Sequence, residues 1–411
     1  MKALAATLAL ALAGCASVPV SPVHPVAAWR PVDAQTGSIV EPAALEQLAQ
    51  DIPDSSSVRL RLLNAQLGAQ DFDGAVASLR WLQLRGHVFS DRAKARIGTV
   101  FGPEREGAVK PLLIDAPKPV VGTTLHAIIP AGAGLVESVL MDLRGGRMAV
   151  TSVSGRSVWA TAPDGTLQEV APEDAGNLSG IVFDPVRNAI WAASGQIDGA
   201  PASGFAGLIE IVPGSGQGRR IPAPGGVSLS DLHRAADGTI FASAPTEGGV
   251  YRLRPDAQSI EQLVPAGTFR SPQGLATSAD GSRLYVSDYR YGIGIVDLAT
   301  GSVSRLSTRL PLMLDGVDGL WRQGHELIAV QNGLSPMRIM VLALSQDGLS
   351  VVGQRTLEIA HPEWTEPLSG YLGGGALYYV ANGQWDRWVD GKPVEGKPFT
   401  QTYIFRLPTE P

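Results

Sequence analysis

Two carboxylates, Glu137 and Asp318, each stand at the start of a short apolar segment with strand character. If the fold directs both starts at one channel, the two charges repel each other, and a bound cation or a shared proton relieves that repulsion. A cation held there would polarise a carbonyl group and lower the pKa of a bound water. Asp318 or Asp231 could then act as general base. Such a cation and base could act together on the carbonyl of a lactone or an ester. The alternative is that both carboxylates are solvated at a wet entrance or brace neighbouring backbone NH groups.

A repeated strand unit is what would position these side chains. The stretch "SPQGLATSADGSRLYVSDY" at residues 271–289 contains a strand start, an Asp-Gly turn and a second strand. Five further segments have the same order, with first strands beginning 42 to 51 residues apart. The six predicted starts are Glu137-Ser138-Val139, Ser179-Gly180-Ile181, Ser230-Asp231-Leu232, Gln273-Gly274-Leu275, Asp318-Gly319-Leu320 and Ser369-Gly370-Tyr371. Six such units predict an all-β fold, a six-bladed β-propeller over residues 122–411. A β-sandwich is the alternative, which the shared internal order disfavours.

The last unit ends soon after its third strand, so its fourth strand has to come from elsewhere in the chain. We expect it upstream, within Leu112–Ile129, because closing the ring removes exposed strand edges. In such a ring the innermost strands line a channel, and their starts meet at one mouth. The small residues that follow five of the six starts suit a close approach of backbone to a central ligand. An insertion in the last unit, Trp385-Asp386-Arg387-Trp388, is a candidate lid over one mouth.

Three of these segments are similar to a known family. They are Glu137-Ser138 in the first unit, "SPQGLATSADGSRLYVSD" in the fourth and "DGVDGLW" in the fifth. They resemble the senescence-marker-protein/gluconolactonase/luciferin-regenerating-enzyme family, which includes regucalcin-like lactonases. The resemblance covers residues 122–407 and rests on short motifs. NHL-repeat, strictosidine-synthase-like and paraoxonase-like propellers share much of the same blade pattern.

The resemblance implies one divalent cation at the channel mouth, with Glu137, Gln273 and Asp318 as its ligands. Gln273 stands where the family has asparagine, so its amide oxygen lies one methylene further out. Ca²⁺ tolerates that change better than Zn²⁺ or Mg²⁺, since its oxygen shell is flexible. The expected cofactor is therefore one divalent cation, with Ca²⁺ favoured.

The resemblance also implies a substrate contact in the third unit. There the chain has Ser230-Asp231 in place of the family's common Asn-Asp pair. We expect Ser230, Asp231 and His233 to bind substrate, and Asp231 or Asp318 to transfer protons. Strand alternation puts His233 on the same side as Asp231. The alternative for His233 is a hydrogen bond to a loop carbonyl.

The N-terminus has the pattern of a bacterial lipoprotein signal. Lys2 precedes an apolar stretch that ends in Leu12-Ala13-Gly14-Cys15, which matches a lipobox. We predict a signal peptide over residues 1–14 and acylation of Cys15. Ala16 indicates the outer membrane, with the propeller facing the periplasm. An ordinary signal peptide beside a chance cysteine is the alternative. Prolines in residues 15–44 predict an extended tether.

Residues 45–100 change to helical spacing of apolar side chains. The stretch Gln70-Asp71-Phe72-Asp73-Gly74 is similar to the turn of a tetratricopeptide repeat, and Asp91 is a plausible N-cap for a third helix. We expect a small helical segment packed against the propeller. It is also a candidate surface for a protein partner, although a lone repeat cannot form a peptide-binding array. Residues 101–121 contain four prolines and are predicted as a linker.

Composition excludes several classes of function. The net charge is −6 without any basic run, so nucleic acid is not an expected partner. The chain lacks the Gly-x-Ser-x-Gly elbow of many serine hydrolases and a dinucleotide-binding glycine motif. Two functions are carried forward. One, implied by the family resemblance, is a membrane-anchored, metal-dependent hydrolase of lactones or related esters. The other is a non-catalytic propeller of the cell envelope that serves as a ligand- or protein-binding scaffold.

Overall fold

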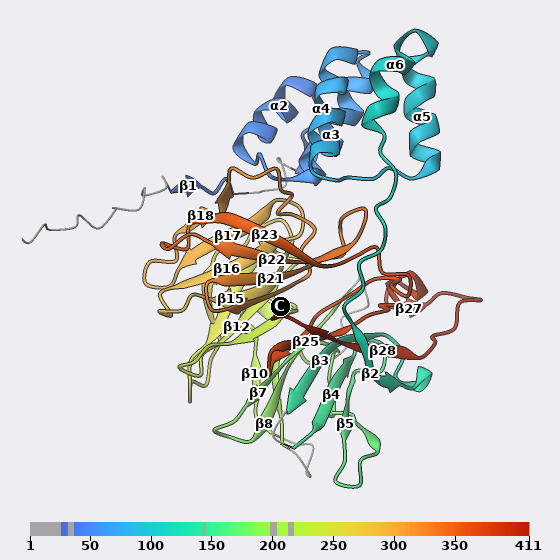
Figure 1. Ribbon diagram of the computed structural model, residues 1–411. Helices are drawn as coiled ribbons and strands as arrows, with labels where there is room; N and C mark the ends of the chain where they lie inside the picture. The colour runs from blue at the N-terminus through green and yellow to red at the C-terminus, as the bar shows by residue number, and fades with distance from the viewer. Residues whose placement is uncertain (1–25, 32–36, 143–144, 198–203, 213–217, 411) are drawn as a thin grey trace, which may run out of the picture.

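The computed structural model describes residues 26–31, 37–142, 145–197, 204–212 and 218–410. Six successive sheets of four or five strands form the larger part of the molecule, which confirms the predicted six-bladed β-propeller. Figure 1 shows these sheets below the helices. Blade 1 consists of β3 (Val136–Asp142), β4 (Arg147–Ser152), β5 (Ser157–Thr161) and β6 (Leu167–Val170). Blade 2 consists of β7 (Asn177–Asp184), β8 (Ala189–Gly195), β9 (Gly207–Ile211) and β10 (Arg220–Pro222). Blade 3 consists of β11 (Leu232–Arg234), β12 (Ile240–Ala244), β13 (Gly249–Leu253) and β14 (Glu261–Val264).

Blades 4 to 6 follow the same order and complete the ring. Blade 4 consists of β15 (Pro272–Thr277), β16 (Arg283–Asp288), β17 (Gly292–Asp297) and β18 (Val303–Arg305). Blade 5 consists of β20 (Gly319–Gln323), β21 (Glu326–Gln331), β22 (Arg338–Leu344) and β23 (Ser350–Ile359). Blade 6 consists of β24 (Gly370–Gly373), β25 (Ala376–Val380), β28 (Thr402–Pro408) and β2 (Thr124–Ile129). A short strand β19 (Ser307–Thr308) pairs parallel with β23. Each predicted strand start lies within two residues of an observed one.

The second strand of blade 4 shows why these sequences form blades. Side chains alternate between the two faces of a strand, and both faces of β16 are covered by a neighbouring blade. Leu284 and Val286 belong to a core shared with blade 3, whereas Tyr285 belongs to a core shared with blade 5. Apolar residues on both faces are therefore stabilised by burial between blades.

The ring closes as predicted, because β2 supplies the fourth strand of blade 6. It pairs antiparallel with β28, from Thr124 opposite Arg406 to Ile129 opposite Thr402. A buried polar group holds the chain just before β2. Glu358 accepts hydrogen bonds from the Gly122 backbone NH (3.0 Å) and from the Tyr379 hydroxyl (2.7 Å). Its carboxyl oxygens are thus satisfied at the point where the two ends of the propeller meet.

The end of the predicted tether is folded rather than extended into solvent. Strand β1 (Ala27–Ala28) pairs antiparallel with β18 and adds a fifth strand to blade 4. Trp29 then packs against Phe269 with ring centroids 4.9 Å apart, and its indole NH donates to the Thr268 carbonyl (2.8 Å). The prediction of an extended tether over 15–44 is therefore wrong for Ala27–Trp29, which pack on blade 4, and for residues 42–44, which begin a helix. Burial of the indole outweighs the preference of the surrounding prolines for extended, solvated chain. Cys15 and the predicted signal peptide lie outside the described residues.

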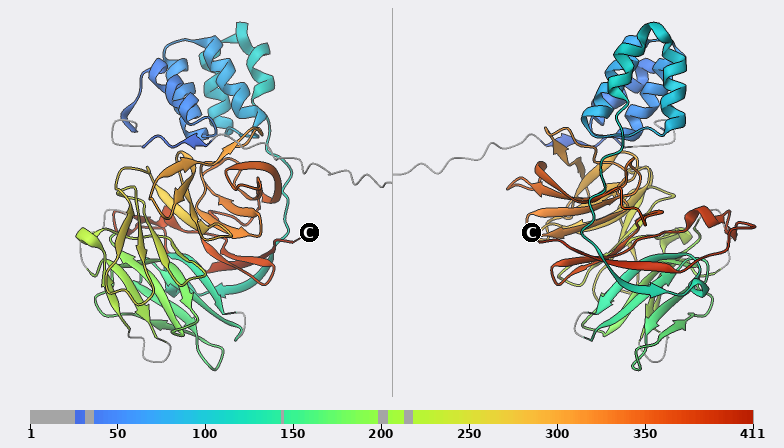
Figure 2. Two further views of the ribbon diagram at one scale, coloured as in Figure 1. Left: turned by 90° about the vertical axis from the view of Figure 1, so that its left-hand side faces the viewer. Right: turned by 45° about the vertical axis from the view of Figure 1, so that its right-hand side comes forward.

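Five α-helices and two 3₁₀ turns, all within residues 42–112, form a layer beside blades 4 and 5 (Figure 2). They are α2 (Pro42–Asp51), α3 (Ser56–Gly68), α4 (Phe72–Leu84) and α5 (Asp91–Phe101), followed by the short α6 (Glu106–Val109) between the 3₁₀ turns η1 (Pro103–Arg105) and η2 (Lys110–Leu112). The linker prediction for 101–121 is wrong in its first half, since Val109 and Leu112 are buried in the core of this layer. The N-cap of α5 is Ser90 rather than Asp91, and its hydroxyl accepts from the Ala93 NH. None of the described helices is both long and apolar enough to cross a membrane.

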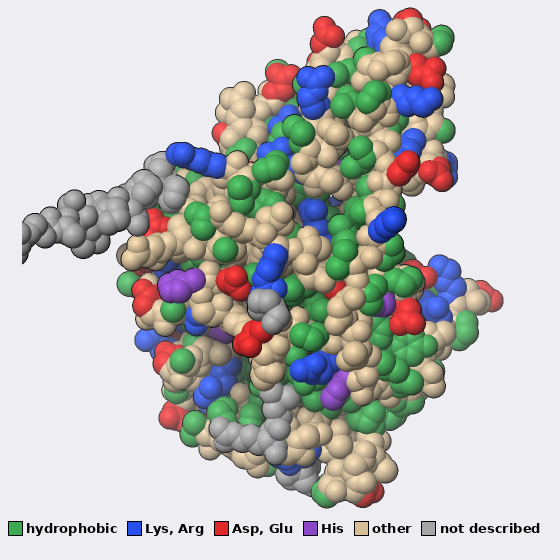
Figure 3. All heavy atoms as spheres, in the orientation of Figure 1, with side chains coloured by type: hydrophobic (Ala, Val, Ile, Leu, Met, Phe, Trp, Pro, Cys, Tyr) green, Lys and Arg blue, Asp and Glu red, His purple; other side chains and the backbone are tan. Residues whose placement is uncertain are grey.

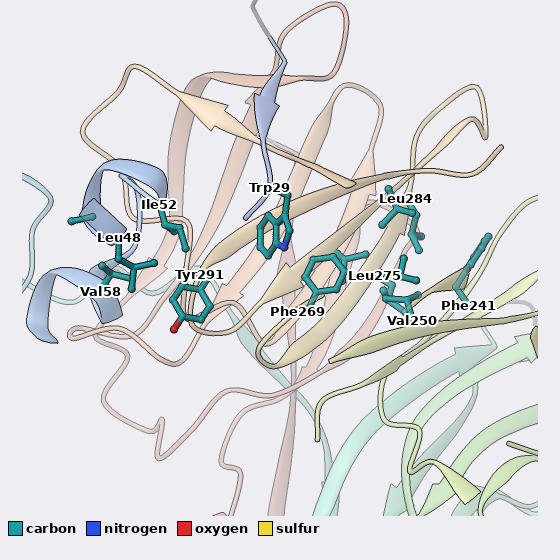
Figure 4. Close-up of a cluster of buried hydrophobic side chains, with 14 of the residues drawn as sticks. Trp29, Leu48, Ile52, Val58, Phe241, Val250, Phe269, Leu275, Leu284 and Tyr291 are labelled. Atoms are coloured by element: carbon teal, nitrogen blue, oxygen red, sulfur yellow. The ribbon is translucent and has the colours of Figure 1, made fainter. Parts of the chain in front are cut away.

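The helical layer is joined to the propeller by apolar packing and by buried polar contacts. Leu48, Ile52 and Val58 share one core with Tyr291 of blade 4 (Figure 4). Asp315 lies in the loop before β20 and accepts from the first NH groups of α3, at 2.9 Å from Ser56 and 2.8 Å from Ser57. A carboxylate at a helix N-terminus satisfies otherwise unpaired donors. The helices therefore hold the loop that leads into one of the innermost strands.

Candidate functional site

The structure brings Glu137, Asp231 and Asp318 together at one mouth of the channel. They come from blades 1, 3 and 5, at the starts of the innermost strands β3, β11 and β20. Their charges are close enough to interact, because Glu137 and Asp231 both raise the pKa of Asp318. Asp231 is buried, and Glu137 and Asp318 are half-buried. The sequence prediction that these carboxylates share one channel is consistent with this geometry.

Glu137 has one defined partner. Its Oε2 accepts a hydrogen bond from the Trp385 indole NH at 2.8 Å. Trp385 begins the turn η5 (Trp385–Arg387), which leads into the hairpin of β26 (Trp388–Val389) and β27 (Lys392–Pro393). Burial, and then the negative charge of Asp231, raise the pKa of Glu137 to about 8. At neutral pH this carboxyl group therefore carries a proton for most of the time.

Asp231 is the most buried of the three carboxylates and accepts a hydrogen bond from the Ser369 hydroxyl. Burial raises its pKa to about 7. A group with a pKa near the working pH is suited to give and take protons during a reaction. Ser230 was predicted as a substrate contact, and in the structure its backbone carbonyl links two blades. Its carbonyl accepts from the Gly180 NH at 3.0 Å and from the Ser179 hydroxyl at 3.2 Å, which ties blade 2 to blade 3.

Asp318 contains a buried oxygen atom without a partner. Its Oδ2 forms no hydrogen bond within the described part of the chain. Burial raises the pKa of Asp318 well above its usual value, and the charges of Glu137, Asp231 and Glu366 raise it further. A buried, unpartnered carboxyl oxygen is costly unless a proton, a water or an ion satisfies it. Among the carboxylates of this mouth, Asp318 is therefore the one whose buried oxygen would be stabilised most by a bound ligand or ion.

Gln273 lies at the same mouth, at the start of β15. Its amide nitrogen donates to the Ser271 hydroxyl at 3.2 Å, and the side chain is half-buried. Across the described residues, no three His, Cys, Asp or Glu side chains are grouped as a metal site. A cation between Glu137 and Asp318 would consequently depend on the Gln273 amide oxygen and on water for its remaining ligands.

His233 faces the channel further in, and its ring is already bonded. Its Nε2 accepts from the Thr277 backbone NH (3.2 Å) and lies 2.9 Å from the Thr277 hydroxyl. Burial, and then the charge of Arg322, lower the pKa of His233 to about 4. The His233 ring therefore bonds to Thr277 of β15 in the next blade, and not to a loop carbonyl, which was the alternative expected from the sequence. This neutral imidazole is poorly placed as a proton shuttle for Asp231.

The glycines after the strand starts serve the ring and not a ligand. A Cβ atom on Gly180 would lie 2.4 Å from the Ser230 carbonyl oxygen, and one on Gly274 would lie 2.4 Å from the Leu320 nitrogen. The Gly274 NH donates to the Asp318 carbonyl at 2.9 Å. Neighbouring innermost strands therefore touch backbone to backbone. The channel narrows here to a neck of about 30 Å³, lined among others by Asp231 and His233.

Sequence reasoning missed two residues at this mouth. Glu366 lies in the loop before β24, and its charge raises the pKa of Glu137, Asp318 and Tyr289. Burial raises the pKa of Tyr289, followed by the charge of Asp318. A signal was available for Glu366, because it precedes Ser369 by three residues at a predicted strand start. Tyr289 follows a second strand and had no such signal.

Comparisons with known proteins support the fold. No family model matches the chain, and no curated protein matches it. A virginiamycin B lyase structure from Staphylococcus aureus is similar, with a TM-score of 0.50 and 11% identity over 69% of this chain and 99% of the lyase. A gluconolactonase from Xanthomonas campestris has a TM-score of 0.48 and 17% identity, over 72% of this chain and 99% of that one. The chain has a propeller fold of the kind found in such proteins. At these identities the likeness concerns the fold alone.

The acidic mouth predicts a dependence of stability on pH. Glu137 and Asp231 have raised pKa values in the folded protein, so their contribution to stability is complete below about pH 4 and is lost as the pH rises through 7 and 8. With a chelator present, we expect the Tm to be lower at pH 8.5 than at pH 5. The double variant Glu137→Gln, Asp231→Asn should reduce this difference by roughly 2–5 °C. Thermal unfolding followed by circular dichroism measures it. An identical pH dependence in wild type and variant would contradict the carboxylate repulsion described above.

Proposed function

We propose that this protein hydrolyses lactones or related esters at the mouth formed by Glu137, Asp231 and Asp318. The observation that supports the proposal most is the buried carboxylate cluster, in which Asp318 Oδ2 has no partner among the described residues. Three buried acids at one opening repel one another and destabilise the fold unless they serve a ligand or a proton transfer. Such a cluster at a channel mouth is a candidate site for hydrolysis.

The proposed reaction uses two carboxyl groups in different protonation states. Asp231, with a pKa of about 7, takes a proton from water as the water oxygen bonds to the carbonyl carbon of the lactone. Glu137, protonated at neutral pH, donates a hydrogen bond to the oxygen on which negative charge develops. The ring C–O bond then breaks, and Asp231 returns the proton to the leaving oxygen. The product is the open hydroxy acid.

A divalent cation could take the place of the Glu137 proton at this mouth, and we propose Ca²⁺ as the preferred one. Glu137, Gln273 and Asp318 would hold it through carboxylate and amide oxygens, the ligands that Ca²⁺ prefers. The unpartnered Asp318 Oδ2 supports this assignment. When bound, the ion would supply positive charge that stabilises a developing oxyanion. The Trp385 indole NH on Glu137 Oε2 leaves Glu137 Oε1 as the oxygen to bind the ion.

An activity panel tests the proposed function. The full mature chain is mixed with sugar lactones, acyl-homoserine lactones and aryl esters, each with EDTA, Ca²⁺, Mg²⁺ or Zn²⁺, and acid release is followed by titration. We expect hydrolysis of at least one lactone, and we expect Ca²⁺ to raise both the rate and the Tm. Hydrolysis at full rate in EDTA would support the carboxylate mechanism and would refute the proposed role of the cation. No hydrolysis together with no Ca²⁺-dependent rise in Tm would refute the enzyme and favour the non-catalytic scaffold.

We also propose that the chain is anchored to the outer membrane through acylated Cys15, with the propeller facing the periplasm. The proposal rests on the Leu12-Ala13-Gly14-Cys15 sequence and on Ala16. Attachment of several acyl chains gives stable anchoring, whereas a single chain holds weakly. Labelling with radioactive palmitate should mark the wild type and leave Cys15→Ser unlabelled. Label in both proteins would show that Cys15 is not the acylated residue.

A further inference from the structure

A larger cavity lies at the opposite end of the same channel. Its volume is about 600 Å³, and each of the six innermost strands contributes lining residues from near its end. The lining includes Ile181 and Phe183 of β7, His233 and Arg234 of β11, Thr277 of β15, and Arg322 of β20. The cavity is therefore on the propeller axis. The 30 Å³ neck separates it from the acidic mouth.

Two guanidinium groups line this cavity, on strands that flank β15. Arg322 is held in position by two carbonyls, with Nε donating to Thr277 (2.7 Å) and Nη1 donating to Gly324 (2.7 Å). Its Nη2 has no hydrogen-bond partner within the described ranges. Arg234 has a buried Nε without a partner there, and its Nη2 reaches Asp184 only at 3.4 Å. The buried Arg234 Nε is costly to leave unpaired unless an acceptor binds to it. Arg322 Nη2 is a donor that a ligand in the cavity could use.

His233 adds a third donor between the two arginines. Because Nε2 accepts from the Thr277 backbone NH, the hydrogen-bond network assigns the ring proton to Nδ1. No partner for Nδ1 is found in the described chain. Arg234 and His233 of blade 3 and Arg322 of blade 5 thus offer donors to one cavity. His233 is fixed by Thr277, and Arg322 by the carbonyls of Thr277 and Gly324, whereas Arg234 has only its long contact with Asp184.

The acidic groups around the cavity already have partners. Asp142 pairs with Arg147 at 2.7 Å. Asp184 accepts from the backbone NH groups of Val186 (3.0 Å) and Arg187 (3.4 Å), in addition to its long contact with Arg234. The charge presented to a ligand is therefore positive.

The walls of the cavity are apolar and aromatic. Phe183, Trp321 and Tyr371 line it together with Leu140 and Leu372. The Trp321 ring packs so closely along its strand that a Cβ on Gly319 would lie 2.2 Å from it. Fixed aromatic walls beside fixed cationic donors are the usual composition of a site for a small molecule with one charged group.

Elsewhere on the protein, the face in Figure 3 shows acidic and basic side chains interspersed.

We propose that this cavity binds a small organic oxyanion, through a carboxylate or phosphate group on Arg234, His233 and Arg322, with its apolar or ring portion against Trp321 and Tyr371. Guanidinium groups match the planar oxygens of these anions. The channel then has two chemically opposite ends, one acidic and one basic, with separate ligands. This site is independent of the proposed lactone hydrolysis.

Calorimetric titration of the full mature chain with four probes tests the proposal. The probes are benzoate, phenyl phosphate, inorganic phosphate and neutral benzyl alcohol, at pH 7.5 in an amine buffer. We expect benzoate or phenyl phosphate to bind, and benzyl alcohol to bind at least tenfold more weakly. Binding of phenyl phosphate alone would identify the phosphate source, and binding of benzoate alone the carboxylate source. If benzyl alcohol binds as well as the anions, or if no anion binds at 5 mM, the proposal fails.

Matched variants place the binding in the cavity. Arg234→Gln and Arg322→Lys should each weaken anion binding at least tenfold, because each removes an oriented donor. Arg254→Gln is the control, since Arg254 is exposed and pairs with Glu261. Arg254→Gln and Asp318→Asn should leave the Kd within twofold, and the second separates this site from the acidic mouth. Should Arg322→Lys fail to fold, Arg234→Gln alone decides. An unchanged Kd in Arg234→Gln would overturn the proposal.

Discussion

Replacing Asp231 by asparagine should lower kcat for lactone hydrolysis about 100-fold or more, since proton transfer by a positioned side chain contributes roughly 10²–10⁴. Asparagine has nearly the same shape and still accepts from the Ser369 hydroxyl, but it cannot take a proton from water. Initial rates of acid release on the best lactone of the panel measure the effect. Asp256→Asn is the control, because Asp256 is exposed and pairs with Arg187 on the surface. A kcat for Asp231→Asn within threefold of the wild type would contradict the assigned role.

The stability of the same variant separates a chemical effect from a folding defect. Asp231 is buried and has a raised pKa, so its charged form destabilises the folded protein at pH 8. The neutral amide should therefore leave the Tm at pH 8 equal to or above that of the wild type. A lost rate with an unchanged or higher Tm points to proton transfer. A lost rate with a lower Tm would mean that Asp231 is a structural residue.

The largest expected effect on stability comes from the strand that closes the ring. Ile129 of β2 is fully buried in the core shared by blades 1 and 6. Ile129→Asp would place an unpaired charge in that core, which should cost about 4 kcal/mol or more. At about 2–4 °C per kcal/mol, the Tm should fall by roughly 10 °C. Thermal unfolding followed by circular dichroism measures the shift.

The neighbouring residue provides a matched control for closure. Ile128 lies on the same strand, and 45% of its surface is exposed. Ile128→Asp introduces the same charge on the opposite face and should change the Tm by less than 2 °C, as surface substitutions usually do. Equal losses in the two variants would show that β2 does not close the propeller in the way described.

The blade repeat and the closure were predictable because both are local or follow from counting. Asp-Gly turns and alternating apolar residues identify strands and hairpins within ten or so residues, as in 271–289. Six starts with only three strands in the last unit require a strand from upstream, and Thr124–Ile129 supplies it. Trp29 was not predictable in this way. Its position depends on a pocket formed by Phe269 and its neighbours, about 240 residues later in the chain.

The sequence by itself determined the period, the number of blades and the residues that open each innermost strand, because these depend on side-chain alternation and turn chemistry. Only the tertiary structure decided how those openings interact. It placed Asp231 close enough to raise the pKa of Glu137, and both close enough to raise the pKa of Asp318. It also added Glu366 to this mouth and made His233 part of the lining of the basic cavity. The physical reason is that repulsion, burial and hydrogen bonding between blades depend on distances across the ring. Those distances are set by backbone contacts such as Gly274 with Asp318, which no local pattern encodes.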